Sequence, residues 1–160
     1  MHVEDLIANY LQTKMISEND VEQIRTDREL RSSLCRYFAV NKNREFALDL
    51  LNLFIGLRKD RENGILMDDL MLGCYIVGLH QQIEDCLLIW KAKKVDFDTY
   101  CGVDNQLMAF AGVVPAIGYL QTLNSEESKD AWECMIAGSD GGDFDDLENY
   151  FSLDNLPWWV

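Results

Sequence analysis

Apolar residues recur along most of the chain with the spacing of an α-helix. In an amphipathic helix, side chains at positions i, i+3, i+4 and i+7 share one face. No segment alternates between apolar and polar residues for long enough to require a strand. The pattern therefore predicts an all-α protein. Its clearest helix covers about residues 44–57, with an apolar face made of Phe46, Leu50, Leu51, Phe54 and Ile55.

Short polar signals indicate where other helices begin and end. Residues 26–29, Thr-Asp-Arg-Glu, have the spacing of a capping box that opens a helix at Thr26, and Ser17 is placed to cap a shorter helix before it. Asp68 and Asp69 favour the positive first turn of a later helix. The polar segment 58–64 ends in glycine and predicts a turn. The expected apolar faces are Leu6, Ile7, Tyr10 and Leu11; Leu30, Leu34, Tyr37 and Phe38; Leu70, Cys74 and Val77; and Ile83, Cys86, Leu87 and Trp90.

Two segments in the middle of the chain share an order of elements. Residues 70–90 and 107–120 each contain an apolar helix, a glycine and a second helix, and Gly112 follows Gly78 by 34 positions. This order resembles an ankyrin-type unit over about residues 70–145, although no Thr-Pro-Leu-His tetrapeptide is present. We expect residues 1–160 to form one domain of about seven to nine helices, stacked as hairpins in an ankyrin-like or HEAT-like array. The residues expected to be buried include Phe38, Phe54, Leu70, Cys74, Leu87, Trp90, Leu107, Ile117 and Trp132.

The charge of the chain is concentrated in its second half. The 160 residues carry a net charge of −14, and residues 95–160 contain 13 acidic side chains against the single basic Lys129. Such a surface repels phosphate backbones and anionic membranes and attracts basic partners. The longest uncharged run, residues 105–125, has an apolar part too short to span a bilayer. We therefore expect a soluble cytoplasmic protein that binds neither nucleic acid nor membranes.

The tripeptide Asp-Phe-Asp occurs at residues 96–98 and again at 143–145. A calcium loop places glycine at its sixth position and glutamate at its twelfth. Counted from Asp96 the sixth residue is Cys101, so the first copy does not fit, and neither does the second. We expect each copy to join two helices, with aspartate capping a helix and phenylalanine packing into the core. In the second copy, Asp145 and Glu148 have the spacing of a cap.

Candidate catalytic residues are few. The five cysteines contain no Cys-x-x-Cys pair, which argues against a zinc site or a disulfide framework. His80 could form a nucleophilic pair with Cys74 or Cys101, but its place at a predicted helix end also suits capping of carbonyl groups. We expect no catalytic residue, no cofactor and no metal; a small cysteine-dependent enzyme remains the third hypothesis.

The segments WKAKKVDFDTYCGVDNQL (90–107) and GGDFDDLENY (141–150) resemble small acidic helical immunity proteins, which bacteria pair with polymorphic or contact-dependent-inhibition toxins. The resemblance implies a cytoplasmic protein, monomeric when free, that binds and blocks one cognate toxin in a 1:1 complex. It implies no cofactor and no catalytic residue. The alternative is a helical-repeat adaptor for protein–protein interaction.

The acidic connectors supply the candidate contacts to a toxin with a basic surface. Repeated helical units would bring these connectors to one edge of the stack. Nearby aromatic residues could act as binding anchors, while the charges set the association rate. The C-terminal Trp158-Trp159-Val160 is expected either to dock in the last helical groove or to serve as such an anchor. The candidate partner-binding residues are Asp96, Asp98, Tyr100, Asp104, Asp140, Asp143, Asp145, Asp146, Glu148, Tyr150 and Trp158.

Overall fold

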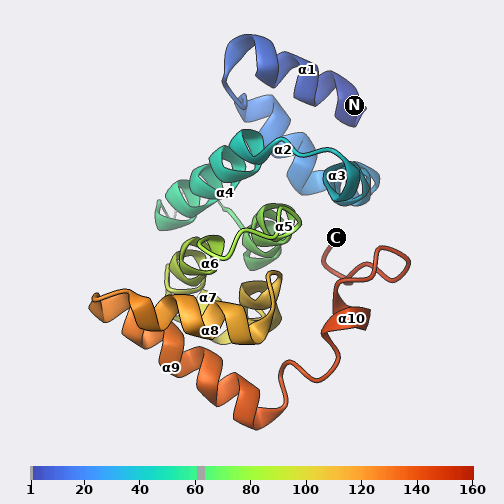
Figure 1. Ribbon diagram of the computed structural model, residues 1–160. Coiled ribbons are helices and arrows are strands. Elements are labelled where there is room, and N and C mark those ends of the chain that lie inside the picture. The colour runs from blue at the N-terminus through green and yellow to red at the C-terminus, as the bar shows by residue number, and fades with distance from the viewer. Residues whose placement is uncertain (1, 61–63) are drawn as a thin grey trace.

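Helices follow one another along almost the whole chain in the computed structural model, which describes residues 2–60 and 64–160 (Figure 1). Within these residues there are ten α-helices, one 3-10 helix and no strand, so the prediction of an all-α fold is confirmed. The number of helices exceeds the prediction because the connectors after residues 96, 104 and 146 each form a short helix. The elements are α1 (Val3–Thr13), α2 (Glu18–Thr26), α3 (Arg28–Val40), α4 (Arg44–Lys59), α5 (Met67–Gly78), α6 (Asp85–Lys93), α7 (Phe97–Gly102), η2 (Asn105–Ala109), α8 (Val113–Thr122), α9 (Glu126–Gly141) and α10 (Leu147–Tyr150).

Helix ends are fixed by short polar side chains. Ser17 caps α2 in a reciprocal capping box with Asp20, as predicted. The prediction of a cap at Thr26 is wrong, because Thr26 is the last residue of α2 and the next residue, Asp27, caps α3. The Oδ1 atom of Asp27 accepts hydrogen bonds from the backbone N–H groups of Glu29 and Leu30, both at 3.0 Å. One aspartate thus separates two helices with no intervening loop.

The predicted connection at residues 58–64 begins two residues later than expected. Arg58 and Lys59 belong to α4. Residues 61–63 lie outside the described residues. Gly64 has a φ of +62°, a conformation that glycine adopts without strain, but the rest of the predicted turn lies outside the described residues.

Helix α5 lies at the centre of the core. Every residue from 69 to 78 is buried, so this helix has no solvent-facing side along most of its length. It packs against α3 and α4 on one side and against α6, α7 and η2 on the other. Figure 1 shows α5 between the N-terminal helices and the α6–α9 group. No helix of residues 2–60 and 64–160 has the length and apolar content to cross a membrane.

Most predicted apolar positions are buried, including the whole predicted face of α4. Leu11 is an exception and is 55% exposed, because α1 lies at the edge of the molecule and buries Leu6, Ile7 and Tyr10 instead. Ile83 is also exposed, since it precedes the first residue of α6. The half-buried positions among those expected in the core are Tyr37, Leu87, Ile117 and Trp132.

The proposed internal repeat is not confirmed. Residues 70–90 contain most of α5 and most of α6, whereas residues 107–120 contain the end of the short helix η2 followed by α8. The second segment therefore lacks a long first helix. Gly112 has a φ of +98° and precedes α8, but Gly78 is the last residue of α5. The two glycines thus occupy different structural positions.

The chain reverses direction after α9, and its C-terminal end returns to the middle of the molecule (Figure 1). Trp159 and Val160 are buried there, and the Trp159 ring makes an edge contact with Tyr75 of α5 at a centroid distance of 5.7 Å. Arg31 of α3, itself buried, donates a hydrogen bond of 2.7 Å to the backbone oxygen of Trp159. The same guanidinium pairs with buried Asp69 of α5 at 2.8 Å. One arginine thus joins α3, α5 and the C-terminal segment.

Candidate functional site

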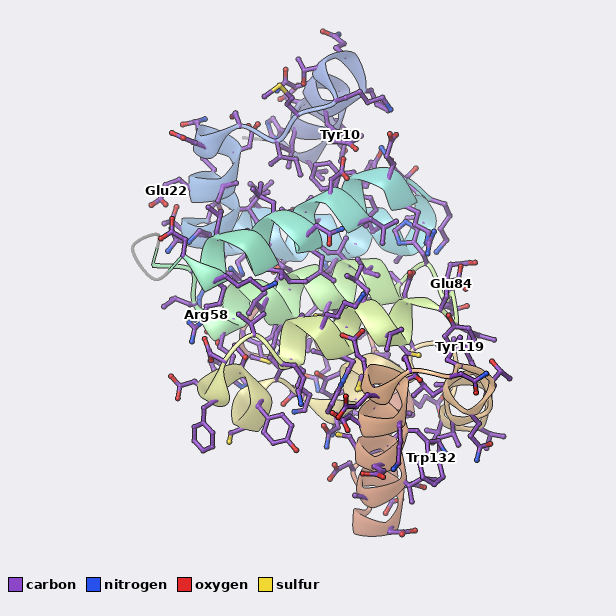
Figure 2. The ribbon with its side chains drawn as sticks, turned by 90° about the vertical axis from the view of Figure 1, so that its left-hand side faces the viewer. Tyr10, Glu22, Arg58, Glu84, Tyr119 and Trp132 are labelled. Atoms are coloured by element: carbon purple, nitrogen blue, oxygen red, sulfur yellow. The ribbon has the colours of Figure 1, made fainter. Side chains whose placement is uncertain are left out.

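The first Asp-Phe-Asp tripeptide begins α7. Asp96 caps this helix by accepting a hydrogen bond of 2.9 Å from the Thr99 N–H, as predicted. Its other oxygen accepts a hydrogen bond of 2.7 Å from Nε of Arg58, which lies at the C-terminal end of α4 (Figure 2). This hydrogen bond is the main reason why the pKa of Asp96 falls to about 2. Asp98 is exposed and lies 3.9 Å from the same guanidinium.

The phenylalanine of this copy does not pack into the core. Phe97 is 78% exposed, which contradicts the prediction. The capping box instead turns Thr99 inward, where its hydroxyl donates to the Lys93 carbonyl oxygen at 3.1 Å. Thr99 is completely buried and therefore anchors the connector.

The second tripeptide follows α9 and precedes α10. Asp143 accepts a hydrogen bond of 2.7 Å from the side-chain amide of Asn105, and Phe144 is half-buried against the core. The predicted cap at Asp145 is wrong, because the residue before α10 is Asp146, and it makes no side-chain cap. Asp145 lies one position too early to bond to the first turn of this helix.

Two connectors meet at the start of η2. Asp104 accepts a hydrogen bond of 2.8 Å from the Tyr150 hydroxyl, while the adjacent Asn105 bonds to Asp143. Burial, together with the charge and hydrogen bond of Asp104, raises the pKa of Tyr150. Asp104, Asp143 and Tyr150 thus lie together, whereas Asp96 and Asp98 lie beside Arg58.

A hollow of about 460 Å³ lies beside this junction. Trp158 stands at it with 71% of its surface exposed, while the neighbouring Trp159 is buried. The Trp159 ring thus packs inside, as the docking prediction expects, while the Trp158 ring faces solvent. The residues that line the hollow are Asp104, Asn149, Tyr150, Asn155, Leu156, Pro157, Trp158 and Trp159.

A run of acidic residues lies next to this hollow. Residues 140–154, which we call the acidic C-terminal segment, contain six acidic and no basic side chains. None of the six forms an ion pair within residues 2–60 and 64–160. Some other acidic residues of the second half do form ion pairs, since Glu127 and Asp130 pair with Lys91 and Lys94. The exposed carboxylates of the segment are Asp140, Asp145, Asp146, Glu148 and Asp154.

The two candidate nucleophiles, Cys74 and Cys101, differ in exposure. Cys74 is fully buried, and burial raises the pKa of its thiol. His80 directs Nδ1 to the carbonyl oxygens of Ile76 and Val77 at 3.1 and 3.3 Å, so it caps α5 as predicted. Cys101 is exposed. Among the described parts of the chain, no three His, Cys, Asp or Glu side chains cluster as they would to hold a metal ion.

Sequence patterns did not identify every residue of the site. Asn155 and Leu156 line the hollow but were not among the candidates. Their position beside Pro157 and Trp158, in a segment too short for a helix, could have indicated that they belong to the site. Exposed Phe97 was missed because the tripeptide pattern does not say which of its side chains the cap turns inward.

No known protein family matches this chain, and no curated protein or solved structure is similar to it. The resemblance of residues 90–107 and 141–150 to immunity proteins therefore stays a hypothesis.

Proposed function

We propose that this protein binds a basic protein partner through its acidic C-terminal segment and the adjacent hollow. In the more specific form of the proposal it is a cytoplasmic immunity protein. It would be monomeric when free and would block one cognate toxin in a 1:1 complex, without a cofactor and without binding nucleic acid.

The observation that carries the proposal is the absence of ion pairs for the six carboxylates of residues 140–154 within the described chain. Unpaired charges of one sign repel one another and destabilise the compact state. A basic partner would relieve that repulsion and would be attracted before contact, which raises its association rate.

Trp158 provides the apolar part of the proposed interface. Tryptophan is among the residues that most often carry binding energy, and an exposed indole loses unfavourable contact with water when a partner covers it. Its position at the hollow, beside Asp104 and Tyr150, offers a basic side chain both a carboxylate and an aromatic face. Asp104 and Asp143 mainly hold the connectors together, because both accept intramolecular hydrogen bonds.

The other two hypotheses predict different behaviour. An adaptor would bind through the same segment without neutralising a toxin. A cysteine-dependent enzyme needs a thiol of lowered pKa, and the burial of Cys74 works against this.

The test is a charge-neutralised variant with Asp140→Asn, Asp145→Asn, Asp146→Asn and Glu148→Gln. The probe is the protein encoded directly upstream, where the resemblance places the toxin gene. Association is measured by stopped-flow fluorescence at several ionic strengths, together with survival of cells that express both proteins. We expect association to slow by about tenfold at low salt, with weaker salt dependence and partial loss of protection.

The matched control removes four exposed charges from the first three helices through Glu4→Gln, Asp5→Asn, Glu18→Gln and Glu29→Gln. It changes the net charge equally and should bind like the wild type. Equal rates for both variants, with folding verified by circular dichroism, would show that the acidic C-terminal segment is not the interface. Binding without any protection would favour the adaptor.

A further inference from the structure

A lysine of this protein lies against two aromatic rings in a second hollow. The ammonium group of Lys94, the residue after α6, lies 5.4 Å from the ring centroid of Trp90 and 5.9 Å from that of Tyr100. The two rings are 6.2 Å apart and inclined by 74°. Both distances are within the range in which a cation is attracted to an aromatic face. The rings therefore form a cation site with an occupant from the same chain.

Helix α9 adds negative charge to this site. Asp130 accepts a hydrogen bond of 3.5 Å from Lys94, and Glu133 lines the same hollow of about 390 Å³. Trp90 comes from α6, Tyr100 from α7 and both carboxylates from α9, and these helices pack together. Three separate elements thus converge on two aromatic rings and two acids.

Lys94 is held only weakly. Its hydrogen bond to Asp130 is at the long limit, and the two side chains are 45% and 44% exposed. Exposed ion pairs of this kind contribute about 0–1 kcal/mol. The neighbouring Lys93 differs, because it is buried and donates a hydrogen bond of 2.6 Å to the Val103 carbonyl oxygen. We therefore expect Lys94 to leave the hollow more readily than Lys93, whose ammonium group also lies 5.6 Å from the Tyr100 ring centroid.

We propose that the hollow lined by Trp90, Tyr100, Asp130 and Glu133 binds an arginine side chain of the basic partner, and that Lys94 occupies this site in the free protein. The inference rests on the proposed function, since the partner supplies the arginine. It adds a second contact on α6, α7 and α9, apart from the acidic C-terminal segment.

Arginine suits the site better than lysine does. A guanidinium is planar and weakly hydrated, stacks on aromatic faces and can donate two parallel hydrogen bonds to one carboxylate. The ammonium of Lys94 forms a single long hydrogen bond to Asp130. An incoming guanidinium can therefore replace a weak internal contact with a stronger one, and Lys94 moves into solvent.

The experiment uses N-acetyl-arginine amide as the probe, so it does not require the partner. Binding is followed by NMR through the indole N–H signals of Trp90 and Trp158. The Trp90 N–H has no hydrogen-bond acceptor within the described residues, so its signal should respond to a ligand in this hollow. The variant Lys94→Met keeps the aliphatic stem and removes the charge. We expect it to bind the probe about two- to fivefold more tightly than the wild type, with the shift at Trp90.

Lys91→Met is the matched control, because Lys91 is also exposed, belongs to α6 and pairs with α9 through Glu127. It changes the net charge equally and should leave the affinity and the Trp90 signal as in the wild type. The double variant Lys94→Met, Asp130→Asn should lose the increase in affinity for N-acetyl-arginine amide that Lys94→Met alone produces. Equal affinity of the Lys94→Met and Lys91→Met variants would overturn the proposal, as would equal binding of N-acetyl-lysine amide. Neither result depends on whether the acidic C-terminal segment binds a toxin.

Discussion

Buried polar side chains within residues 2–60 and 64–160 cap helix ends or join separate helices. Asp20 and Ser128 belong to capping boxes, and Arg31 joins α3 to α5 and to the C-terminal segment. Asp85 at the start of α6 accepts hydrogen bonds from both Nε and Nη2 of Arg44 on α4. Because an unpaired buried polar group is costly, these bonds also specify which helices pack together.

His80 gives the stability a pH dependence. Burial beside Phe38 lowers its pKa, and Lys42 adds to this effect, while the bonds to Ile76 and Val77 and the charge of Asp85 oppose it. The unfolded chain therefore binds a proton, near its ordinary pKa of about 6.5, that the folded chain binds only at lower pH. We expect the free energy of unfolding to decrease as the pH falls through about 6.5.

Urea unfolding between pH 7.5 and 5.5 measures this effect. The variant His80→Asn keeps a side-chain donor but cannot titrate, so its stability should fall less over this range. The control His2→Asn removes the exposed histidine and should retain the wild-type pH dependence. If the free energy of unfolding of His80→Asn changed with pH as much as that of the wild type, a group other than His80 would be the cause of the pH dependence.

At the scale of helices, close packing decides which glycines can change. A Cβ atom on Gly78 at the end of α5 would lie 2.1 Å from Cδ2 of Phe110. That ring cannot move freely, because it stacks on Phe151 at 3.9 Å and contacts Tyr75 edge-on at 5.1 Å. Gly118 in the middle of α8 has no atom within 4 Å of the same position. Close packing against Phe110 therefore requires glycine at position 78, whereas position 118 has space for a larger side chain.

We expect Gly78→Ala to lower the free energy of unfolding by about 1–3 kcal/mol through displacement of Phe110. Gly118→Ala should raise it by about 0.5–1 kcal/mol, since alanine is the better helix former. Urea denaturation followed by circular dichroism compares the two variants directly. Equal stability of both would mean that the Phe110 ring accommodates the added methyl group.

The sequence predicted the elements better than their contacts. The face of α4 follows from regular spacing, and its five predicted apolar residues are all buried. The pairing of Arg58 with Asp96 joins residues 38 positions apart, and no periodic pattern connects them. Leu11 was placed wrongly because periodicity identifies an apolar face but not whether another element covers it. Phe97 was placed wrongly because the tripeptide pattern does not say which of its side chains turns inward. The junction of Asp104 with Tyr150 likewise depends on the reversal of the chain after α9.

Across the described part of the molecule, ion pairs connect the two halves of the chain but include no carboxylate of residues 140–154. Arg58, Lys91 and Lys94 pair with acids of the second half, but these pairs end before residue 140. The acidic C-terminal segment follows, and the chain then returns to the core through Trp159. The segment is thus held at both of its ends, by α9 and by the buried chain end.

The two adjacent tryptophans should respond differently to substitution. Trp159→Ala removes a buried ring that contacts Tyr75 and should lower the free energy of unfolding by about 3–5 kcal/mol. Trp158→Ala should change it by less than about 0.5 kcal/mol, because the ring is exposed, yet it should weaken partner binding. Thermal unfolding and titration with the upstream-encoded protein separate the two effects. A large loss of stability in Trp158→Ala would contradict the division of roles.

The burial of residues 69–78 of α5 has a consequence for hydrogen exchange. Its backbone amides are covered by α3 and α4 on one side and by α6, α7 and η2 on the other, so local fraying exposes few of them. Amides of this kind exchange with deuterium only when the whole domain unfolds. The free energies of opening obtained from exchange along residues 70–77 should then be nearly uniform and should equal the global free energy of unfolding under native conditions. This helix would provide an internal reference against which the opening of every other segment can be measured.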